Sequence, residues 1–480
     1  MEHPIDVAII GGGFTGAVLA ILLQRRLDPS RRVCFFEPRP EGGQGVAYGT
    51  DDPWYLLNAP ASGMSALSDT PEGFRDFLLA QDASGAEGTD LPGPVAEERA
   101  MPAGRRFAQR RLYGRYVAEL LDGALRAPGA RLEHRRVAVS DLRRDPAGGW
   151  RIEAGEAGAR ARLCILALGN APAPRVPEGC EPAGAATTED AVLLVGSGLT
   201  MADNVLSLLA EGHRGPIRVV SRHGWLPLPH PDVPAAEPWQ LQPPPGATAV
   251  AGTMDGAADG NGATLLALMR WLRAEARRAE AAGVPWQAVM DAARGAAPGL
   301  WRGLSLAERR RFLRHGRSPW GQHRHRVAPS VSRALARAAA EEQLTIQAGR
   351  FRGCERGAGG LIARVVRRGD GAEEQLPVRE VRLCTGVGQG RSWEAQAPTA
   401  AMLERGSIRL DPLGFGLDAD PDSCAMPDRE GRLTADLFAV GPCAAGGWWE
   451  ITAVPEIRRQ AEALVERLVA GNGPLAGPAD

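Results

Sequence analysis

The hydrophobic residues of this chain fall into short apolar runs that alternate with helical patterns. Residues Ile5 to Ile10 form an apolar run with β-branched side chains, which predicts a buried parallel strand. A glycine-rich turn follows, then an apolar helical pattern from Phe14 to Leu27 and a second strand-like run from Arg32 to Phe36. This order predicts a βαβ unit, in which a helix connects two parallel strands.

The same order begins again near the middle of the chain. Ala191 to Val195 is an apolar run, followed by a glycine turn, a helical pattern through Leu209 and a run from Pro216 to Val220. Each half then continues through a long insert into short alternating segments, which are typical of a β-meander, and ends on an apolar strand. The sequence therefore indicates a weak internal duplication.

The first glycine turn has the spacing of a dinucleotide-binding loop. Gly11, Gly13 and Gly16 follow a predicted strand and open a predicted helix, and the acid Glu37 comes 21 residues after the last glycine. These glycines permit the tight turn, the approach of a pyrophosphate and close packing of helix on strand. The pyrophosphate would lie on the positive helix end, and the acid can accept hydrogen bonds from a ribose diol.

The second glycine turn departs from this pattern at two positions. Gly196 and Gly198 keep the first two glycines, but Met201 occupies the third position. The residue 26 positions after Gly196 is Arg222, whereas the same step in the first half leads to Glu37. An acid repels a 2′-phosphate and an arginine can pair with it, so the second site is predicted to prefer NADPH to NADH. The alternative for Arg222 is a solvated surface arginine.

We therefore expect an α/β fold with two Rossmann-like domains of the glutathione-reductase type, β-meanders and a helical insert. Residues 1–175 and 386–480 are expected to form the two parts of one dinucleotide-binding domain, which the family resemblance described below assigns to FAD, and residues 186–385 an NADPH-binding domain. The helical pattern at about 263–340 predicts the insert, which we expect to build the substrate pocket. A chain of 480 residues is too long for one ordinary domain.

Composition excludes several classes of function. The formal net charge is -1, so no overall field recruits nucleic acid or an anionic membrane. All 56 Lys and Arg residues are arginine, which excludes Schiff-base chemistry on a lysine. No apolar run reaches 18 residues and no signal peptide opens the chain, so we expect a cytoplasmic protein without a membrane segment.

The cysteines give no sign of a structural or redox site. The chain has 7 cysteines, an odd number, and their scattered spacing includes no C-x-x-C pair. This spacing suggests neither a disulfide framework nor a zinc site, and it suits a reducing compartment. It also argues against a flavin disulfide reductase, because that chemistry needs a redox cysteine pair.

Several segments spread over the chain resemble one family of flavoprotein monooxygenases. That family includes the two-nucleotide type of FAD-dependent urate hydroxylase and the aspartate N-monooxygenases of nitrosuccinate pathways. The resemblance implies bound FAD, reduction by NAD(P)H and insertion of oxygen through a flavin C4a-hydroperoxide. The similar segments are GGGFTG (11–16), GVAYGTDDPWYLLNAPASGMSA (45–66), RRLYGRYV (110–117), VGSGLTMAD (195–203), VSRHGWLPLPH (220–230), WGQHRHRVAP (320–329) and GPCAAGGWWEITAVPEIR (441–458).

The resemblance also assigns roles to residues beyond the glycine turns. It places the loop containing Asn58 and Met64 over the flavin ring, although Asn58 can also cap a turn and Met64 can be plain core. The C-terminal segment resembles a closing FAD motif in which Pro442 replaces the usual aspartate. The residues expected to bind FAD are Gly11, Gly13, Phe14, Thr15, Gly16, Glu37, Gly441, Trp449 and Thr452, and those expected to bind NADPH are Gly196, Gly198, Leu199, Thr200, Ser221 and Arg222.

A cluster of cationic side chains suggests where a substrate is held. His323, Arg324 and His325 are predicted to bind an anionic substrate, and a structural hydrogen-bond network is the alternative. No metal is expected there, because imidazoles at i and i+2 would point to opposite sides of a strand.

The predicted function is an FAD- and NADPH-dependent monooxygenase. Its partners would be molecular oxygen and a small, nitrogen-containing anion, with urate hydroxylation and amino-acid N-hydroxylation both open. A homo-oligomer is possible. The alternatives are an NAD(P)H-dependent flavin reductase, oxidase or dehydrogenase without oxygen insertion, and a nucleotide-binding protein without turnover.

Overall fold

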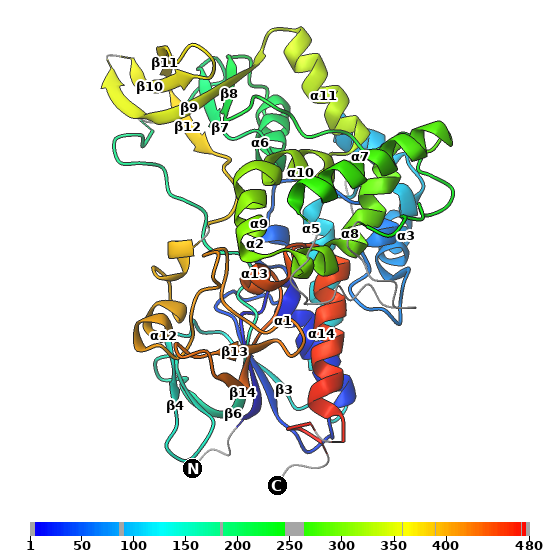
Figure 1. Ribbon diagram of the computed structural model, residues 1–480, viewed down its shortest axis with the longest axis vertical. Helices are drawn as coiled ribbons and strands as arrows, with labels where there is room; N and C mark the ends of the chain where they lie inside the picture. Colours follow the sequence, from blue (N-terminus) through cyan, green and yellow to red (C-terminus); the bar gives the residue numbers. More distant parts are fainter. Residues whose placement is uncertain are drawn as a thin grey trace.

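The computed structural model describes residues 5–85, 91–182, 186–244, 264–357, 359–388, 390–471 and 473–476. The predicted first residue of the insert, 263, and both ends of the chain lie outside these ranges. Within them, the chain builds two sheets that follow one another along the long axis of the molecule, with a group of helices between them at one side (Figure 1).

The first sheet combines strands from both ends of the chain. In the described residues it has 8 strands, in the order β13-β14-β6-β1-β2-β3, with β4 and β5 continuing from β6. All pairs from β14 to β3 are parallel, and β13 is antiparallel to β14. The strands are β1 (Ile5–Ile10), β2 (Val33–Phe36), β3 (Leu132–Arg135), β4 (Asp141–Arg144), β5 (Trp150–Glu153), β6 (Ala159–Leu166), β13 (Ala425–Pro427) and β14 (Leu433–Ala439).

The largely apolar sequence of β1 is explained by its position at the centre of this sheet. Val7 pairs with Val33 of β2 on one side and with Leu163 of β6 on the other. Ile9 belongs to the core beneath helices α1 (Phe14–Arg26), α5 (Arg110–Leu125) and α14 (Val454–Val469), whereas Ile10 belongs to the core on the opposite face. Because both faces are covered, the strand is apolar except at Asp6, whose buried carboxylate pairs with Arg31 at 2.8 Å.

The second sheet contains the same arrangement of two parallel strands connected by a helix. Its order in the described residues is β11-β10-β9-β8-β7-β12, with β12, β7, β8 and β9 parallel and β9, β10 and β11 forming an antiparallel meander. Helix α6 connects β7 to β8 as α1 connects β1 to β2, which confirms the predicted pair of Rossmann-like units. The elements are β7 (Val192–Val195), α6 (Leu199–Ala210), β8 (Ile217–Ser221), α11 (Pro329–Ala340), β9 (Leu344–Gly357), β10 (Gly360–Arg367), β11 (Glu373–Val378) and β12 (Glu380–Leu383).

The helical insert leaves the second unit after β8 and lies at the level where the two sheets meet (Figure 1). It consists of α7 (Leu265–Ala281), α8 (Trp286–Gly303), α9 (Leu306–Arg311), a π-helical turn (Phe312–Gly316) and α10 (Arg317–Arg324). The remaining short helices are α2 (Gly45–Tyr48), η1 (Ala61–Gly63), α3 (Gly73–Ser84), α4 (Pro94–Arg99), η2 (Ala103–Arg105), η4 (Gly390–Trp393), α12 (Thr399–Arg405), η5 (Pro442–Ala444) and α13 (Ala445–Trp448).

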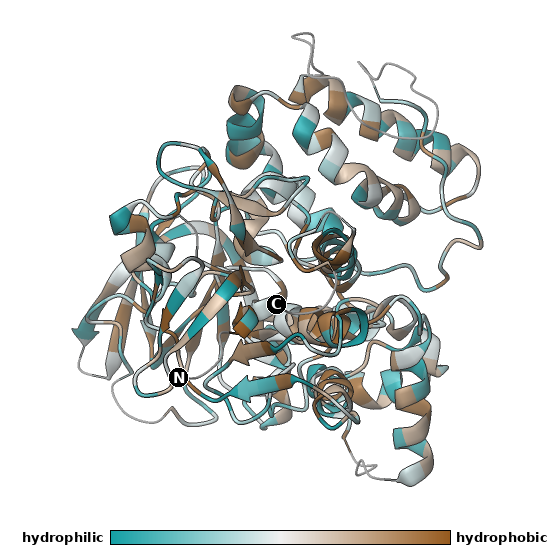
Figure 2. Cartoon of the chain, turned by 90° about the horizontal axis from the view of Figure 1, so that it is seen from below, coloured by the Kyte–Doolittle hydropathy of each residue, from teal (hydrophilic) through white to brown (hydrophobic). Residues whose placement is uncertain are grey.

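Hydropathy follows this architecture. Hydrophobic residues are frequent in the central strands and helices of Figure 2, and hydrophilic residues in the outer loops. Among the described residues, no helix combines the length and apolar character that a membrane span requires.

The structure corrects the prediction that the cysteines form no disulfide. Cys180 lies in the connection between the two units and Cys354 lies in β9, and the two are joined by a disulfide with a Cα–Cα distance of 5.1 Å. They are 174 residues apart in sequence, so spacing along the chain cannot reveal the contact. The cysteine pattern therefore no longer supports the argument for a reducing compartment.

The first glycine turn is fixed by close approach between β1, α1 and the end of β6. Gly11 has φ +102°, and a Cβ there would lie 2.5 Å from the carbonyl oxygen of Ala167. A Cβ on Gly16 would lie 1.9 Å from the carbonyl oxygen of Gly11. The first and third glycines are therefore required by packing, as the sequence pattern predicts.

Replacing Gly16 with alanine should destabilise the protein, because the new methyl group has to displace α1 from β1. We expect a loss of about 1–3 kcal/mol, seen as a lower thermal unfolding midpoint. Gly123→Ala is a matched control, because Gly123 lies within helix α5 with no atom within 4 Å of an added Cβ. That control should gain up to about 1 kcal/mol from helix propensity. Equal midpoints for the two variants would contradict the packing argument.

Candidate functional site

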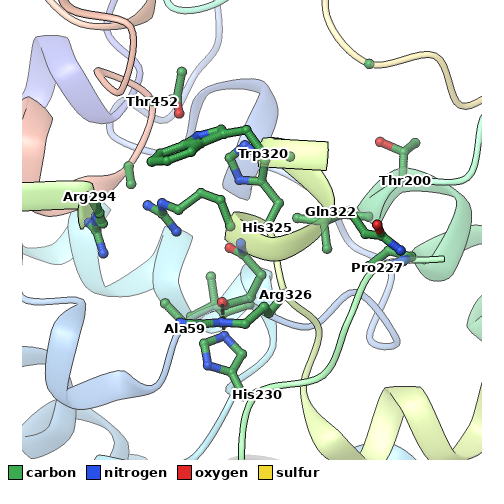
Figure 3. A pocket seen from close by; sticks show the side chains of 18 of the residues that line it. Ala59, Thr200, Pro227, His230, Arg294, Trp320, Gln322, His325, Arg326 and Thr452 are labelled. Carbon is green, nitrogen blue, oxygen red and sulfur yellow. Dashed lines mark hydrogen bonds between the residues drawn. The ribbon is translucent and has the colours of Figure 1, made fainter. Parts of the chain in front are cut away.

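A cavity of about 2380 Å³ lies where the two sheets and the insert meet. Its wall includes the loop 57–60, the second glycine turn, the end of β8, faces of α8 and α10, and residues 449–455 of the C-terminal segment. Figure 3 shows that Thr452, Trp320, Arg294 and His230 reach this space from different parts of the chain. The cavity is thus built by elements of both units and of the insert.

Many of the residues singled out from the sequence line this cavity. Those in the wall are Asn58, Met64, Gly196, Gly198, Leu199, Thr200, Ser221, Arg222, Arg324, His325, Trp449 and Thr452. Those outside it are Gly11, Gly13, Phe14, Thr15, Gly16, Glu37, His323 and Gly441, although Pro442 beside Gly441 is in the wall.

The first glycine turn is complemented by residues from three other segments. Glu37 is buried, and its carboxylate accepts hydrogen bonds from the N–H of Gly12 at 3.0 Å and from the N–H of Arg39 at 3.1 Å. A Cβ on Gly13 would lie 3.3 Å from the Cα of Gly45, and one on Gly441 would lie 2.7 Å from Oγ1 of Thr15. Gly441 therefore closes tightly on the start of α1.

This turn fits a bound dinucleotide. No side chain caps α1, and no acid lies in its first turn. The N–H groups of that turn, which begins at Phe14, are therefore available to a phosphate, and the helix dipole favours a negative charge there.

The second glycine turn is more open. Gly196 has φ +112°, and a Cβ there would lie 2.2 Å from the carbonyl oxygen of Cys384, which repeats the tight turn of the first unit. Gly198 faces open space, with nothing within 4 Å of an added Cβ. Met201 is fully buried in the core beneath α6, so the missing third glycine is replaced by a packed side chain. The open space above Gly198 and an uncapped α6 fit a second dinucleotide.

Positive charge gathers at the end of β8. Arg222 donates to Oγ of Ser318 at 3.4 Å, and Arg368 donates to the carbonyl oxygen of Arg222 and contacts His223. Burial lowers the pKa of Arg317, and the charge of Arg222 lowers it further. No carboxylate among the described residues pairs with Arg222 or Arg317. The cluster can therefore accept a phosphate, as the arginine at this position predicts.

The C-terminal segment contains a strained turn beside the cavity. Trp449 has φ 62° and ψ −64°, and the N–H of Glu450 donates to the carbonyl oxygen of Trp448 at 2.7 Å. This is a γ-turn of the rare positive-φ type, which costs about 1–3 kcal/mol for a side chain as large as tryptophan. Such strain persists only where the surroundings hold it, and here the Trp449 ring stacks on Trp301 of α8 at 5.2 Å and meets Phe312 edge-on at 4.7 Å. Both of these rings come from the insert, and a third, Phe415, packs on Trp449 from outside it at 5.4 Å.

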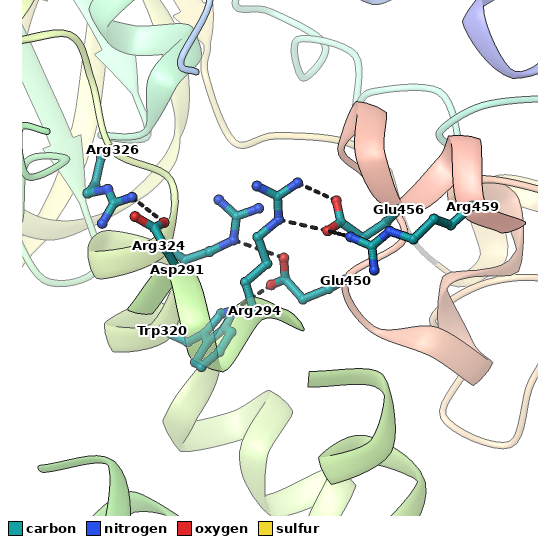
Figure 4. A network of polar contacts seen from close by, with 8 residues as sticks. All are labelled: Asp291, Arg294, Trp320, Arg324, Arg326, Glu450, Glu456 and Arg459. Atoms are coloured by element: carbon teal, nitrogen blue, oxygen red, sulfur yellow. Dashed lines mark hydrogen bonds and ion pairs between the residues drawn. The ribbon is translucent and has the colours of Figure 1, made fainter. Parts of the chain in front are cut away.

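Glu450 fastens the same turn to the insert (Figure 4). Its buried carboxylate accepts hydrogen bonds from Nε1 of Trp320 at 2.6 Å and from Nε of Arg324 at 3.1 Å. A second bridge joins Arg294 of α8 to Glu456 of α14. The insert is thus joined to the C-terminal segment of the first unit by two ion pairs, of which Arg294–Glu456 reaches the last helix.

A further group of polar residues lies near the Asn58 loop. Nε2 of His230 lies 3.0 Å from the carbonyl oxygen of Asn58, and Arg326 pairs with Asp291 of α8. Burial lowers the pKa of His230 to about 4, and the pKa of His325 to about 4 as well. Both imidazoles are therefore neutral at physiological pH.

The predicted His323–Arg324–His325 cluster has a different geometry in the structure. His323 and Arg324 end the helix α10 and are not on a strand. His323 packs edge-on against Trp286, and its Nδ1 lies 2.8 Å from the carbonyl oxygen of Pro319. The described residues contain no group of His, Cys, Asp and Glu side chains suited to a metal ion.

Several residues of the site carried no signal in the sequence. Asp291, Trp301 and Phe312 lie in the insert, where the sequence pattern predicts helices but no role for individual side chains. Glu450 lies in the segment 441–458, which resembles the monooxygenase family, but its partners Trp320 and Arg324 are at least 126 positions away in the sequence.

The comparisons with known proteins agree with this geometry. Residues 8–171 match a family model described as FAD-NAD(P)-binding. No curated protein matches the sequence of this chain. Among solved structures, the chain is similar to the ornithine N-hydroxylase of Kutzneria sp. 744 with reduced FAD, NADP+ and L-ornithine, with TM-score 0.59 and 14% identity over 97% of this chain and 98% of that one.

Two further solved structures show the same fold. One is the FAD-bound cadaverine monooxygenase of the desferrioxamine pathway from Erwinia amylovora, with TM-score 0.61, 12% identity, and coverage of 97% of this chain and 94% of that chain. The other is the L-lysine 6-monooxygenase from Pseudomonas syringae, with TM-score 0.57, 16% identity, and coverage of 97% and 99%. The chain therefore has the fold of these monooxygenases, with an FAD-NAD(P)-binding region at residues 8–171.

Replacing Arg222 with alanine should weaken NADPH binding without weakening NADH binding. Loss of a charged hydrogen bond to the 2′-phosphate predicts a rise in the Kd of NADPH of about 10- to 100-fold. The Kd values can be measured by fluorescence titration of the purified protein. Arg356→Ala is the control, since Arg356 is an exposed residue of β9 outside the cavity wall. An unchanged NADPH/NADH preference in Arg222→Ala would show that the assignment is wrong.

Replacing Glu450 with glutamine should loosen the turn at Trp449. The change leaves Arg324 buried without its counter-charge, which costs about 3–5 kcal/mol in comparable pairs. We expect a lower thermal midpoint and a lower ratio of flavin to protein absorbance after gel filtration. Glu430→Gln removes an exposed partner of Arg432 and should change neither quantity. Full flavin retention by Glu450→Gln would contradict the role given to this carboxylate.

Proposed function

We propose that this protein is an FAD- and NADPH-dependent monooxygenase that hydroxylates the nitrogen of a small amine-containing substrate. The observation that carries the proposal is the shared cavity, whose wall includes the second glycine turn, the Asn58 loop and the Trp449–Thr452 segment. A hydride donor, a flavin and a substrate can therefore meet in one shared cavity.

The two cofactors would be held by different sets of residues. FAD would lie on the first turn of α1, with Glu37 toward its ribose, Gly441 beside its phosphates, and Asn58, Met64 and Thr452 toward the flavin ring. NADPH would lie on the first turn of α6, with Ser221 and Arg222 toward its 2′-phosphate. Reduced FAD supplies the chemistry by activating dioxygen for transfer of one oxygen atom to the substrate.

The residues of the chain would orient the reactants and exclude water. Trp449 lines the cavity and is backed by Trp301 and Phe312, so this part of the wall would be apolar and would exclude bulk water. His230 is neutral, and because a carbonyl can only accept, its Nε2 donates to the carbonyl of Asn58 and fixes that loop.

Amine N-hydroxylation is favoured over urate hydroxylation by two observations. The solved structures with the same fold are described as acting on ornithine, lysine and cadaverine, all of which carry an amine. In addition, the cationic residues expected to hold an anion are engaged elsewhere, since Arg324 pairs with Glu450 and His323 lies outside the cavity wall.

A flavin reductase or oxidase built on the same fold is the second candidate. The specific case of a disulfide reductase is disfavoured by the cavity itself. Cys384 is the cysteine in the wall among the described residues, and burial raises its pKa to about 12, so it holds its proton. The disulfide of Cys180 and Cys354 does not line the cavity.

The proposed activity predicts NADPH oxidation and oxygen consumption that rise together when a suitable amine is added. We expect the purified, FAD-loaded protein to form a hydroxylamine with little hydrogen peroxide. Oxygen uptake, peroxide and product mass should be measured with ornithine, lysine, cadaverine, aspartate and urate. NADPH oxidation that produces stoichiometric peroxide with every compound would instead identify an oxidase.

A further inference from the structure

The insert side of the cavity carries ion pairs whose acids differ sharply in accessibility. The pairs are Arg324–Glu450, Arg294–Glu456 and Arg326–Asp291 (Figure 4). The side chains of Glu450 and Glu456 are 3% and 6% exposed, whereas that of Asp291 is 54% exposed. A ligand in the cavity therefore meets the carboxylate of Asp291 and not the other two.

Arg326 orients this carboxylate and is itself out of reach. Its Nη2 donates to Oδ1 of Asp291 at 2.5 Å, and its Nη1 donates to the carbonyl oxygen of Gln287 at 3.1 Å. The Arg326 side chain is 2% exposed, so no substrate anion can use its guanidinium. Within the described residues, Oδ2 of Asp291 has no hydrogen-bond partner. The pair thus presents a free, negatively charged oxygen to the cavity.

The imidazoles near Asp291 do not oppose a cationic ligand. His230 lies close enough to feel the charges of both Arg326 and Asp291, and it contacts the Asn58 loop. It is neutral, because burial lowers its pKa to about 4, so it neither repels a cation nor attracts an anion. His325, also in the wall, is neutral for the same reason.

We propose that Asp291 binds an ammonium group of the substrate other than the nitrogen that is hydroxylated, which makes the substrate a small molecule with at least two amines. The proposal rests on the proposed function and adds to it the residue that selects the substrate. It replaces the sequence-based expectation of an anionic substrate held by His323, Arg324 and His325. A charged hydrogen bond between an ammonium and a carboxylate is stronger than a neutral one, so Asp291 is a specificity-determining residue.

Equilibrium dialysis with FAD-loaded protein tests this assignment without turnover. The probes are cadaverine and L-lysine, which carry primary ammonium groups on a flexible chain, and L-aspartate and urate, which are anionic. We expect cadaverine or lysine to bind more tightly than either anion. Asp291→Asn should weaken that binding by about 10- to 100-fold, and Asp291→Glu should restore part of it.

Two further variants separate binding from folding. Asp291→Asn leaves Arg326 without a counter-charge, so the double variant Asp291→Asn/Arg326→Met removes both charges and keeps an apolar side chain of similar length. The double variant should have the same thermal unfolding midpoint as the unmodified protein and should still bind the ammonium probes weakly. Asp422→Asn is the matched control, because Asp422 pairs with Arg302 of the same helix α8 at 2.9 Å, outside the cavity wall.

The proposal is overturned if folded Asp291 variants bind cadaverine and lysine as tightly as the unmodified protein. It is also overturned if aspartate or urate binds more tightly than both ammonium probes, or if neither ammonium probe binds. Dialysis needs neither NADPH nor oxygen, so the two experiments can fail independently. A failure to form hydroxylamine would contradict the proposed function without changing the binding result for Asp291.

Discussion

The carboxylate of Glu450 joins the helical insert to the C-terminal segment of the first unit, and the shape of the cavity depends on that junction. A buried carboxylate is costly unless its oxygens are hydrogen-bonded and its charge is compensated. Here Trp320 occupies one oxygen and Arg324 the other. Without these partners, the strained turn at Trp449 would lose the anchor that follows it directly in the chain.

The same junction explains why the insert is built as it is. Its helices carry the aromatic rings that hold Trp449 and the arginines that pair with acids of the last segment. The π-helical turn at Phe312–Gly316 interrupts the regular hydrogen-bond pattern where Phe312 meets Trp449. Such turns are frequent at functional sites, because they change the direction of side chains within a helix.

The two glycine turns share a topology and differ in what surrounds them. The first is closed by Glu37, Gly45 and Gly441, and lies outside the wall of the main cavity. The second faces the cavity directly, with open space above Gly198 and a cluster of positive charge at Arg222. The closed first turn suits a nucleotide that stays bound, and the open second turn suits a nucleotide that binds and dissociates.

The sequence by itself determined the fold and the positions of both glycine turns. Apolar runs, glycines and helical patterns are local, so their spacing alone is informative. Gly16 is required by its contact with Gly11 in the same turn, whereas Gly11 is required by its contact with Ala167, which follows β6. Arg222 was singled out by its spacing from the second turn, and its role stays a prediction. The tertiary structure decided the rest, because it depends on contacts between distant segments. The disulfide of Cys180 with Cys354 arises only when the connection between the units folds against β9. The pairing of Glu450 with Arg324 and the exposure of Asp291 arise only when the insert folds against the rest of the chain. An arginine looks the same in sequence whether it faces a ligand or is neutralised by an acid more than a hundred residues away.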